Sequence, residues 1–249
     1  MNNRVIIPNW NKPTKVKVLI TTRNGGVSMG AYRSFNLAAH VDDDPTLVLQ
    51  NRKILSQYLP SEPIWLKQTH STNILNLIDN IDNIKINLEN EYDGIITNNK
   101  SQVAVVMTAD CIPLLLTDKH GTFVGAIHAG WRGLANGIVD NVLTQINVIK
   151  KDILAYIGPT ICKHHFEVGH DVYQLFNLSF NYDKYFVSHN NGKFLCDLPS
   201  IIKEQLINNG ILEENITNSN LCTYCKSDLF FSHRRDKVTG RIASLIWLV

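Results

Sequence analysis

One stretch of the chain, residues 103–133, carries three apolar blocks separated by short polar breaks. The blocks lie at 103–107, 112–117 and 123–127, and turn residues occupy 118–121. Continuous apolar runs of this length, bounded by turn residues, are typical of fully buried strands. The pattern predicts two buried strands joined by a turn, around which we expect the rest of the chain to be organised.

Strand-like and helix-like spacings continue on both sides of this stretch. Short apolar runs predict strands at 64–71, 193–196 and 242–249, a strand between two turns within 92–98, and a strand and its stop within 153–159; an alternating run predicts an edge or half-buried strand at 15–22. Helical spacing predicts helices at 45–58, 134–149, 171–178 and 198–209. The apolar stripe of 134–149 consists of Leu134, Ile138, Val142, Leu143 and Ile146. Because strands recur throughout and no Pro- or Gly-rich linker divides the chain, we expect one α/β domain with a mixed sheet over residues 1–249.

We predict a structural role, and no cation binding, for two Asp-rich segments. Residues 42–44 lack the later ligands of a calcium loop, and Asp44-Pro45 is a typical helix start. These aspartates therefore predict an N-cap and a first helical turn. Residues 74–90 repeat Ile-Asp-Asn, which predicts an irregular strand and loop whose repeat is only compositional.

Composition narrows the class of protein. With 249 residues, 44% of them hydrophobic and 18% charged, the chain can bury a sizeable core. A net charge of +2 is too small to predict binding to nucleic acid or to an anionic membrane surface. The start shows no signal-peptide pattern, and no apolar run reaches the roughly 18 residues of a membrane span. Five cysteines, an odd number, favour a reduced, cytoplasmic protein with free or metal-bound thiols.

Polar side chains cluster where the central strands are expected to end. Asp110 and Cys111 follow the first block, and His128 and Arg132 follow the last. Cys111 has the chemistry of a thiolate ligand or a nucleophile, and His128 that of an imidazole ligand or a base. Arg132 would lie near the start of the helix expected at 134–149, a position suited to anions. The end of this sheet is therefore the expected site of chemistry.

Other polar residues carry weaker signals. Arg23 lies in a glycine-containing loop and is either a solvated turn residue or an anion ligand. His70, taken alone, is interpreted as a structural histidine and not as a metal ligand. Cys222 and Cys225 form half of a zinc ribbon with no second pair in the sequence, so we reject a four-ligand zinc site there.

Two further polar segments stay open at this stage. The adjacent residues 164–165 are both histidine, and on a strand they would point to opposite faces, so we assign them no ligand role. Residues 230–236 place four charged groups beside two phenylalanines, which fits either a buried ion network or a phosphate clamp.

Several of these motifs together resemble the multicopper polyphenol oxidoreductase (laccase-like) family, reassigned as purine nucleoside phosphorylases with adenosine deaminase activity. The resemblance begins at residues 22–28 and covers nearly the whole chain; its other motifs lie at 67–71, 92–94, 108–113, 128–133, 157–159, 167–169 and 231–235. The Ala-Asp-Cys and His-Ala-Gly-Trp-Arg-Gly motifs are specific in combination. The resemblance implies a single layered α/β/β/α domain with mixed sheets, similar to the cytotoxin deamidase-like cysteine hydrolases.

The resemblance also implies a ligand set that the spacing of these residues alone does not give. By this resemblance His70, Cys111 and His128 bind zinc, with copper as an alternative metal. Three protein ligands leave the fourth tetrahedral position open, as in a catalytic zinc site. Asp110 joins Cys111 and His128 as a catalytic candidate.

The implied activity is that of a zinc-dependent purine nucleoside enzyme. It would phosphorolyse adenosine, inosine and methylthioadenosine to the free base plus (methylthio)ribose 1-phosphate, and deaminate adenosine to inosine with water activated by zinc. Arg23 and Arg132 are candidates for phosphate binding, and Asn36 and Gln68 for binding the nucleoside. The expected partners are purine nucleosides and phosphate, with neither nucleic acid nor membrane, and the expected state is a monomer or a weak homo-oligomer.

Two other classes of function stay open. A copper polyphenol oxidase of the laccase type needs many more histidine ligands than a chain with nine histidines offers in clusters. A metal-free cysteine hydrolase acting on a peptidoglycan precursor would use Cys111 as the nucleophile and His128 as the base. Metal content separates the three, because zinc, several coppers and no metal are their respective expectations.

Overall fold

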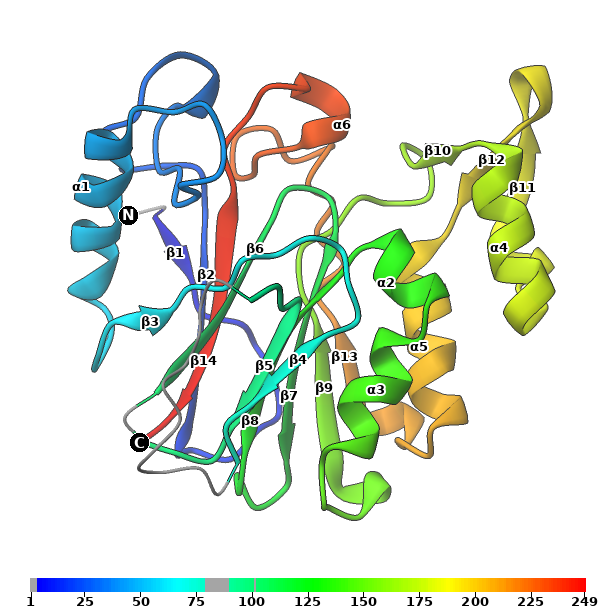
Figure 1. Cartoon of the computed structure of the whole chain (residues 1–249), viewed down its shortest axis with the longest axis horizontal. Helices are drawn as coiled ribbons and strands as arrows, with labels where there is room; N and C mark the ends of the chain where they lie inside the picture. The colour runs from blue at the N-terminus through cyan, green and yellow to red at the C-terminus, as the bar shows by residue number, and fades with distance from the viewer. Residues whose placement is uncertain (1–3, 79–89, 101) are drawn as a thin grey trace.

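Two β-sheets lie face to face between two layers of helices (Figure 1). The computed structural model describes residues 4–78, 90–100 and 102–249. The first sheet has the order β1 (Val5–Ile6), β2 (Val16–Thr21), β14 (Ile242–Leu248), β6 (Val103–Thr108), β3 (Pro63–Ile64). The second has the order β13 (Ile216–Asn218), β9 (Ile153–Ile157), β7 (Ile112–Asp118), β8 (Val124–Ala129), β5 (Gly94–Thr97), β4 (Ile74–Asn76). Both sheets are mixed, so the expected α/β/β/α layering is confirmed.

Helices cover the two outer faces of this sandwich. On one side lies α1 (Pro45–Ser56), and on the other lie α2 (Trp131–Ala135), α3 (Ile138–Thr144) and α5 (Leu198–Asn208) (Figure 1). The helix α6 (His233–Asp236) precedes β14, and short 3₁₀ turns lie at Gly30–Tyr32, Lys150–Asp152, Asp183–Tyr185, Asn190–Gly192 and Glu213–Asn215. In the part of the chain that the structure describes, no helix is both long and apolar enough to cross a bilayer.

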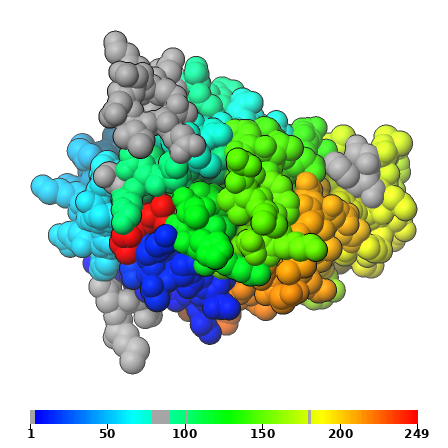
Figure 2. All heavy atoms as spheres, turned by 90° about the horizontal axis from the view of Figure 1, so that it is seen from below, coloured from blue at the N-terminus to red at the C-terminus, as the bar shows by residue number. Residues whose placement is uncertain are grey.

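A small antiparallel sheet projects from one end of the molecule. It has the order β10 (Glu167–Val168), β12 (Lys193–Cys196), β11 (Phe186–His189), with α4 (His170–Phe180) packed beside it. Seen from below, this segment forms the end of the body next to α5 (Figure 2). Its apolar residues join the same core as α3 and α5, so it belongs to the single domain.

Three apolar layers hold the sandwich together. The inner faces of the two sheets pack on one another through residues such as Val18, Val106 and Leu115. The outer face of the first sheet packs against α1, and that of the second against α2, α3, α4 and α5. Because both sheets are covered on both faces, β6, β7, β8 and β9 are buried along their whole length. This explains their continuous apolar sequences.

Most predicted elements are confirmed, with four differences. Residues 103–133 contain three strands instead of two, and β6 belongs to a different sheet from the β7–β8 hairpin. The strand at 15–22 lies inside its sheet, between β1 and β14, and is not an edge. The strand at 64–71 is short, since regular pairing stops at Ile64. Most of the Ile-Asp-Asn segment lies outside the described residues.

The fourth difference concerns the helix expected at 134–149. It is two short helices, α2 and α3, because Gly137 takes a left-handed conformation (φ +86°) that breaks the hydrogen-bond ladder. The whole predicted apolar stripe is nevertheless buried. By contrast α1 begins as predicted, with the Asp44 carboxylate accepting a hydrogen bond from the backbone N–H of Thr46 (2.8 Å).

Candidate metal centre and its cavity

The ends of three strands bring His70, Cys111 and His128 together. His70 lies in the loop before β4, Cys111 in the connection from β6 to β7, and His128 near the end of β8. Their ligand atoms all lie within 4.8 Å of one another, and His70 Nε2 lies 3.7 Å from Cys111 Sγ. The two imidazole rings meet edge to face, with their centroids 4.7 Å apart.

The backbone around this group takes unusual conformations that only a tight constraint would hold. His70 (φ +64°) and Asp110 (φ +93°) both have left-handed backbones, which are rare for residues other than glycine. Gly130 packs against the same group, and a Cβ there would lie 2.7 Å from His70 Cδ2 and 3.1 Å from Cys111 Sγ. A side chain larger than hydrogen at 130 would therefore push the ligand atoms apart.

Asp93, directly before β5, fixes the positions of both histidines. Its fully buried carboxylate lies 2.7 Å from His128 Nδ1 and accepts hydrogen bonds from the backbone N–H groups of residues 69, 70 and 71. The Ser71 hydroxyl donates a further bond (2.7 Å). Because Nδ1 of His128 faces Asp93, its Nε2 is free to face Cys111 and His70. This is the arrangement that orients histidine ligands in metal sites.

The electrostatics of the group favour a thiolate beside an imidazolium when no metal is bound. Burial raises the pKa of Cys111, but the charge of His128 and hydrogen bonds from both histidines outweigh it and lower the pKa to about 6. Burial lowers the pKa of His128, whereas Cys111 and Asp93 raise it to about 9. Burial also opposes the ionisation of Asp93, yet its bonds to His128 and Ser71 leave its pKa lowered.

The donor set fits a tetrahedral metal ion with an open position. With Zn–S near 2.3 Å and Zn–N near 2.0–2.1 Å, neighbouring S and N ligands are about 3.6 Å apart. The 3.7 Å between Cys111 Sγ and His70 Nε2 matches that separation. Imidazole and thiolate suit both zinc and copper, so the donors alone do not fix the metal.

A cavity of about 450 Å³ opens above this group and is rich in positive charge. Arg132, Arg234 and Arg241 line it together with His40 and His233, while Trp131 and Phe166 contribute aromatic surface. The Arg241 guanidinium donates to the backbone oxygens of residues 239 and 240, and burial lowers its pKa although Cys111 and Asp110 oppose this. Cationic groups beside a thiol and two imidazoles make the cavity suitable for an anionic ligand.

Three of the other predicted site residues lie at the cavity. Gln68 lines it, but its amide bonds both the backbone N–H and the oxygen of Met107 (2.8 and 2.9 Å). Asp110 also lines it, and its two carboxylate oxygens accept bonds from the Thr223 hydroxyl and the Arg234 backbone N–H (both 2.6 Å). Arg132 lines it with its guanidinium over the Trp131 ring. Among the described residues Arg132 has no carboxylate partner.

Two predicted residues lie away from the cavity. Arg23 borders a separate surface hollow, stacks on Phe231 and donates to the backbone oxygens of residues 33 and 227. Asn36 is fully buried and accepts a hydrogen bond from the backbone N–H of Arg241 (2.9 Å). Substrate binding by these two residues stays a prediction, whereas the observed role of Asn36 is to hold the segment that presents Arg241.

Arg132 lies in the first turn of α2, as the sequence predicted, but this helix is too short to form an anion site. Helix α2 has only five residues, and Gly130 at its N-cap makes no side-chain hydrogen bond. A helix this short has little dipole to offer an anion, because the dipole grows with the number of aligned peptide units. Any anion binding at Arg132 would therefore depend on its guanidinium.

The rejection of a four-ligand cluster at Cys222 and Cys225 is wrong in its geometry. The structure places Cys162 and His165 beside this pair, so four donor side chains meet where the sequence showed two. His165 and His164 lie in a turn and not on a strand, which removes the reason for setting both aside. Asp93, Gly130 and Arg241 were not predicted to be site residues, because their types and spacing carry no local signal of a shared site.

Comparisons with known proteins agree on one family. Residues 17–249 match the family model described as "Multi-copper polyphenol oxidoreductase laccase". The purine nucleoside phosphorylase of Haemophilus influenzae is 42% identical over 98% of this chain and 99% of its own. Purine nucleoside phosphorylase YfiH of Escherichia coli is 39% identical over 99% of this chain and all of its own.

Solved structures show the same fold. A crystal structure of a Neisseria meningitidis protein superposes with a TM-score of 0.90 at 41% identity, covering 98% of this chain and 99% of that chain. Bacillus licheniformis protein YfiH gives a TM-score of 0.88 at 32% identity, covering 99% and 97%.

Proposed function

The chain belongs to the family described as multi-copper polyphenol oxidoreductase laccase, whose relatives named above are purine nucleoside phosphorylases, and from this premise we propose that it is a zinc-dependent purine nucleoside phosphorylase. The observation that carries the proposal is the meeting of His70, Cys111 and His128 at a cavity lined by arginines. Phosphorolysis needs a cation-rich pocket for phosphate next to the nucleoside, and this cavity offers one.

The arginines are the proposed phosphate ligands. Arg132 and Arg241 point positive charge into the cavity without a carboxylate bonded to either among the described residues. Bidentate guanidinium–phosphate bonds would hold phosphate for attack on C1′ of the ribose while the purine leaves. Trp131 and Phe166 supply the flat apolar surface that a purine ring needs.

The metal group is the proposed second element of the site. When bound, zinc supplies a Lewis acid with one coordination position left open by the protein. Asp93 keeps His128 in the tautomer whose Nε2 can ligate, and Cys111 is available as a thiolate. On this basis we also propose deamination of adenosine to inosine, and methylthioadenosine as a further phosphorolysis substrate. Purine nucleosides and phosphate are thus the proposed partners.

The assay is inosine turnover with and without phosphate. We expect hypoxanthine and ribose 1-phosphate only when phosphate is present, with inosine and ammonia from adenosine as the deamination products. Free ribose formed equally well without phosphate would make the protein a hydrolase. The Cys111→Ala variant should lose both activities and the zinc at the cavity while keeping its fold, as checked by circular dichroism. Full activity in that variant would overturn the role of the triad.

The other two classes of function have less support in the residues. Within residues 4–78, 90–100 and 102–249, histidines join only two groups of the metal-ligand type, and these contain His70, His128 and His165. A trinuclear copper cluster needs many more. A cysteine hydrolase would use Cys111 and His128 without His70, so the close approach of His70 Nε2 to the sulfur favours the metal. Oxidation of phenols by the copper-loaded protein, with no nucleoside turnover, would favour the polyphenol oxidase over the nucleoside phosphorylase.

A further inference from the structure

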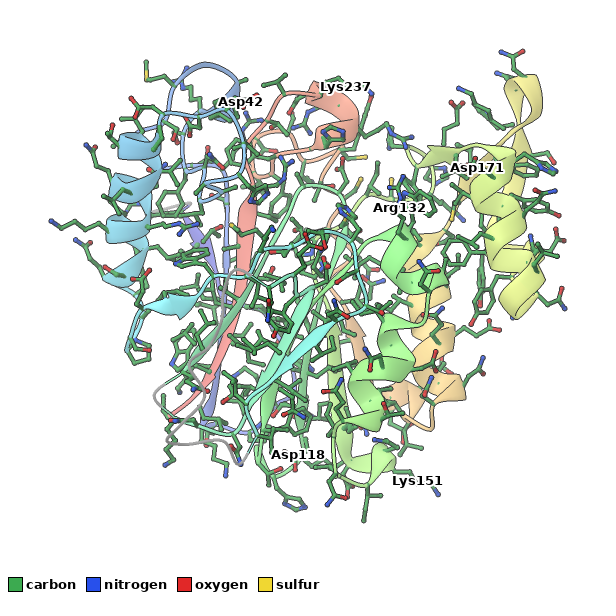
Figure 3. All side chains as sticks on the ribbon, in the orientation of Figure 1. Asp42, Asp118, Arg132, Lys151, Asp171 and Lys237 are labelled. Carbon is green, nitrogen blue, oxygen red and sulfur yellow. The ribbon has the colours of Figure 1, made fainter. Side chains whose placement is uncertain are left out.

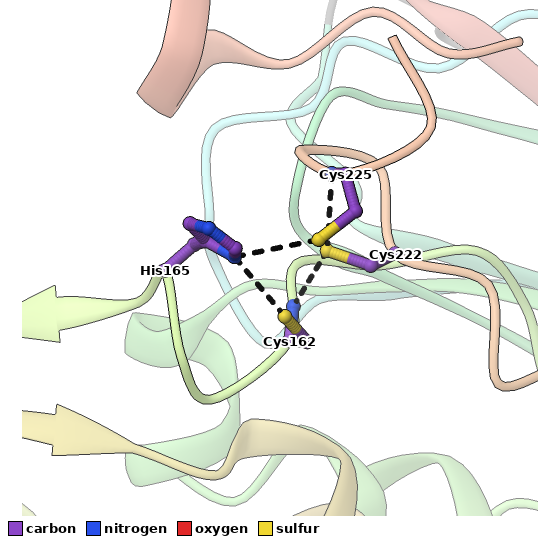
Figure 4. Close-up of side chains that lie close together, drawn as sticks. All are labelled: Cys162, His165, Cys222 and Cys225. Carbon is purple, nitrogen blue, oxygen red and sulfur yellow. Dashed lines mark hydrogen bonds between the residues drawn. The ribbon is translucent and has the colours of Figure 1, made fainter.

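Three cysteines and one histidine form a second cluster, and none of the four lines the cavity of the triad. Cys162 and His165 belong to the turn after β9, and Cys222 and Cys225 belong to the loop after β13. All four donor atoms lie within 4.8 Å of one another. His165 Nδ1 lies 3.3 Å from Cys162 Sγ and 3.5 Å from Cys225 Sγ (Figure 4).

These separations are those of ligands around one small metal ion. Around a tetrahedral zinc, an S–N pair is about 3.6 Å apart and an S–S pair about 3.8 Å. We propose that Cys162, His165, Cys222 and Cys225 form a closed structural zinc site, distinct from the open site at His70, Cys111 and His128. Four protein donors fill the tetrahedron, so this second ion would have no position for substrate.

The spacing of the ligands supports this assignment. Each half of the site is a pair separated by two residues, Cys-x-x-His and Cys-x-x-Cys, which are the spacings of structural zinc sites. The two halves are 60 residues apart in the chain and meet because Thr160 forms a β-bridge with Cys222. Three sulfurs and one imidazole make up the Cys₃His donor set of structural zinc sites.

The surroundings prepare the donors for an ion. The backbone N–H groups of Cys162 and Cys225 both point at the sulfur of Cys222 (3.3 and 3.5 Å), which favours a thiolate there. The ring of His165 stacks on Tyr224, with the centroids 4.0 Å apart and the planes 15° apart. Because Tyr224 lies between the two cysteines of its loop, this stacking holds Nδ1 toward the sulfurs.

The site joins the segment between Ile161 and Phe166, which lines the catalytic cavity, to a neighbouring loop that bonds the cavity residue Asp110. Arg234 donates to the backbone oxygen of His165 (3.2 Å), and its backbone N–H donates to Asp110. Thr223, inside the Cys-x-x-Cys turn, donates to the same Asp110 carboxylate (2.6 Å). Phe166, the residue after His165, lines the cavity itself. Zinc at this cluster would therefore hold the cavity wall in place without taking part in the chemistry.

The test is the zinc content of protein purified under thiol-reducing conditions without added metal. We expect the wild type to hold two zinc ions per chain, and His165→Ala and Cys111→Ala to hold one each. His164→Ala is the matched control, because it removes the neighbouring histidine, which lies outside the cluster, and should keep both ions. His165→Cys should also keep both, since four cysteines form a structural site equally well.

A second measurement covers the case in which His165→Ala does not fold. X-ray absorption at the zinc edge of Cys111→Ala should show three sulfurs at about 2.3 Å and one nitrogen at about 2.0 Å. A shell of nitrogen and oxygen alone would overturn the proposal. The proposal would also fail if the wild type held one zinc ion that is lost in Cys111→Ala and kept in Cys225→Ser. A disulfide between two of the three cysteines in the reduced preparation would likewise contradict it.

These outcomes are independent of the nucleoside assay. If phosphorolysis fails but the absorption spectrum shows three sulfurs, the second zinc site stands and the proposed function falls. If phosphorolysis succeeds and only one zinc is found, the proposed function stands and the second zinc site falls. Because the site supports the wall and not the reaction, we expect His165→Ala to raise KM more than it lowers kcat.

Discussion

Replacing Asp93 by asparagine tests whether one buried carboxylate imposes the geometry of the triad. In the native protein Oδ1 accepts from the backbone N–H of His70 and lies 2.7 Å from His128 Nδ1. Oδ2 accepts from the backbone N–H groups of Thr69 and Ser71 and from the Ser71 hydroxyl. Asparagine has one acceptor oxygen, so whichever way it turns, its NH₂ group faces at least two N–H donors.

The expected loss of unfolding free energy in Asp93→Asn follows from those lost hydrogen bonds. A hydrogen bond to a charged group contributes about 1.5–3 kcal/mol, so losing two costs about 3–6 kcal/mol of unfolding free energy. That is a large fraction of the roughly 5–15 kcal/mol that stabilises a typical domain. If His128 avoids the clash by changing tautomer, its proton moves to Nε2 and removes the lone pair that would bind metal. We therefore expect zinc affinity at the cavity to fall about 10- to 100-fold.

The assay is a competition titration with a chromogenic chelator, with Cys111→Ala as the reference for an empty cavity site. Asp118→Asn is the matched control, because Asp118 is also buried (1% exposed) and accepts a bond from the backbone N–H of Thr122. It lies at the opposite end of the second sheet from Arg132 (Figure 3). The control should lower the melting temperature and leave zinc affinity unchanged.

Two results would refute this reasoning. Equal zinc affinity in Asp93→Asn and the wild type, with a lowered melting temperature, would reduce Asp93 to a structural residue. Equal losses of zinc affinity in both variants would show that any buried charge change disturbs the site, so that the contact to His128 has no special part in it.

Three further substitutions test the cavity. Gly130→Ala should lower zinc affinity without changing circular dichroism, because its Cβ would lie 2.7 Å from His70 Cδ2; unchanged affinity would show that the ligands can move aside. Arg132→Lys should reduce inosine phosphorolysis more than adenosine deamination, since an ammonium keeps charge but loses the bidentate fork; equal losses with a matching drop in melting temperature would favour a structural arginine. Arg241→Gln should raise KM for phosphate about tenfold or more, the effect of losing one charged hydrogen bond, and an unchanged KM would place phosphate elsewhere.

The strands were predictable from sequence because both sheets are covered on both faces. Runs such as 112–116 and 153–157 have no charged residue and no alternation of apolar with polar residues, which a strand with one uncovered face would show. The break between α2 and α3 was less evident, since the apolar stripe continues through it. The signal was present as Asn136-Gly137, and its left-handed glycine ended the helix despite the favourable periodicity.

The triad was only partly within reach of sequence reasoning. A tight turn at 118–121 pairs Ile112 with Ala129, so the hairpin alone brings Cys111 close to His128. His70 has no such local constraint. It reaches the site because β4 pairs in parallel with β5 and because Asp93, directly before β5, accepts a hydrogen bond from the backbone N–H of His70. Parallel pairing between distant segments leaves no spacing rule in the sequence.

The cluster of Cys162, His165, Cys222 and Cys225 was also beyond sequence reasoning, because it depends on the register between two parallel strands. The parallel pairing of β13 with β9 sets Asn218 beside Ile157, and the chains run on together to the bridge between Thr160 and Cys222. Two residues past that bridge Cys162 lies among the other ligands. A shift of the pairing by one residue would turn the ligand side chains of the two segments to opposite faces, so that they would no longer meet. Cysteine pairs counted along the sequence therefore miss the site, because a strand register brings its ligands together. Helices α4 and α5 lie between the two strands in the chain and make their parallel pairing possible.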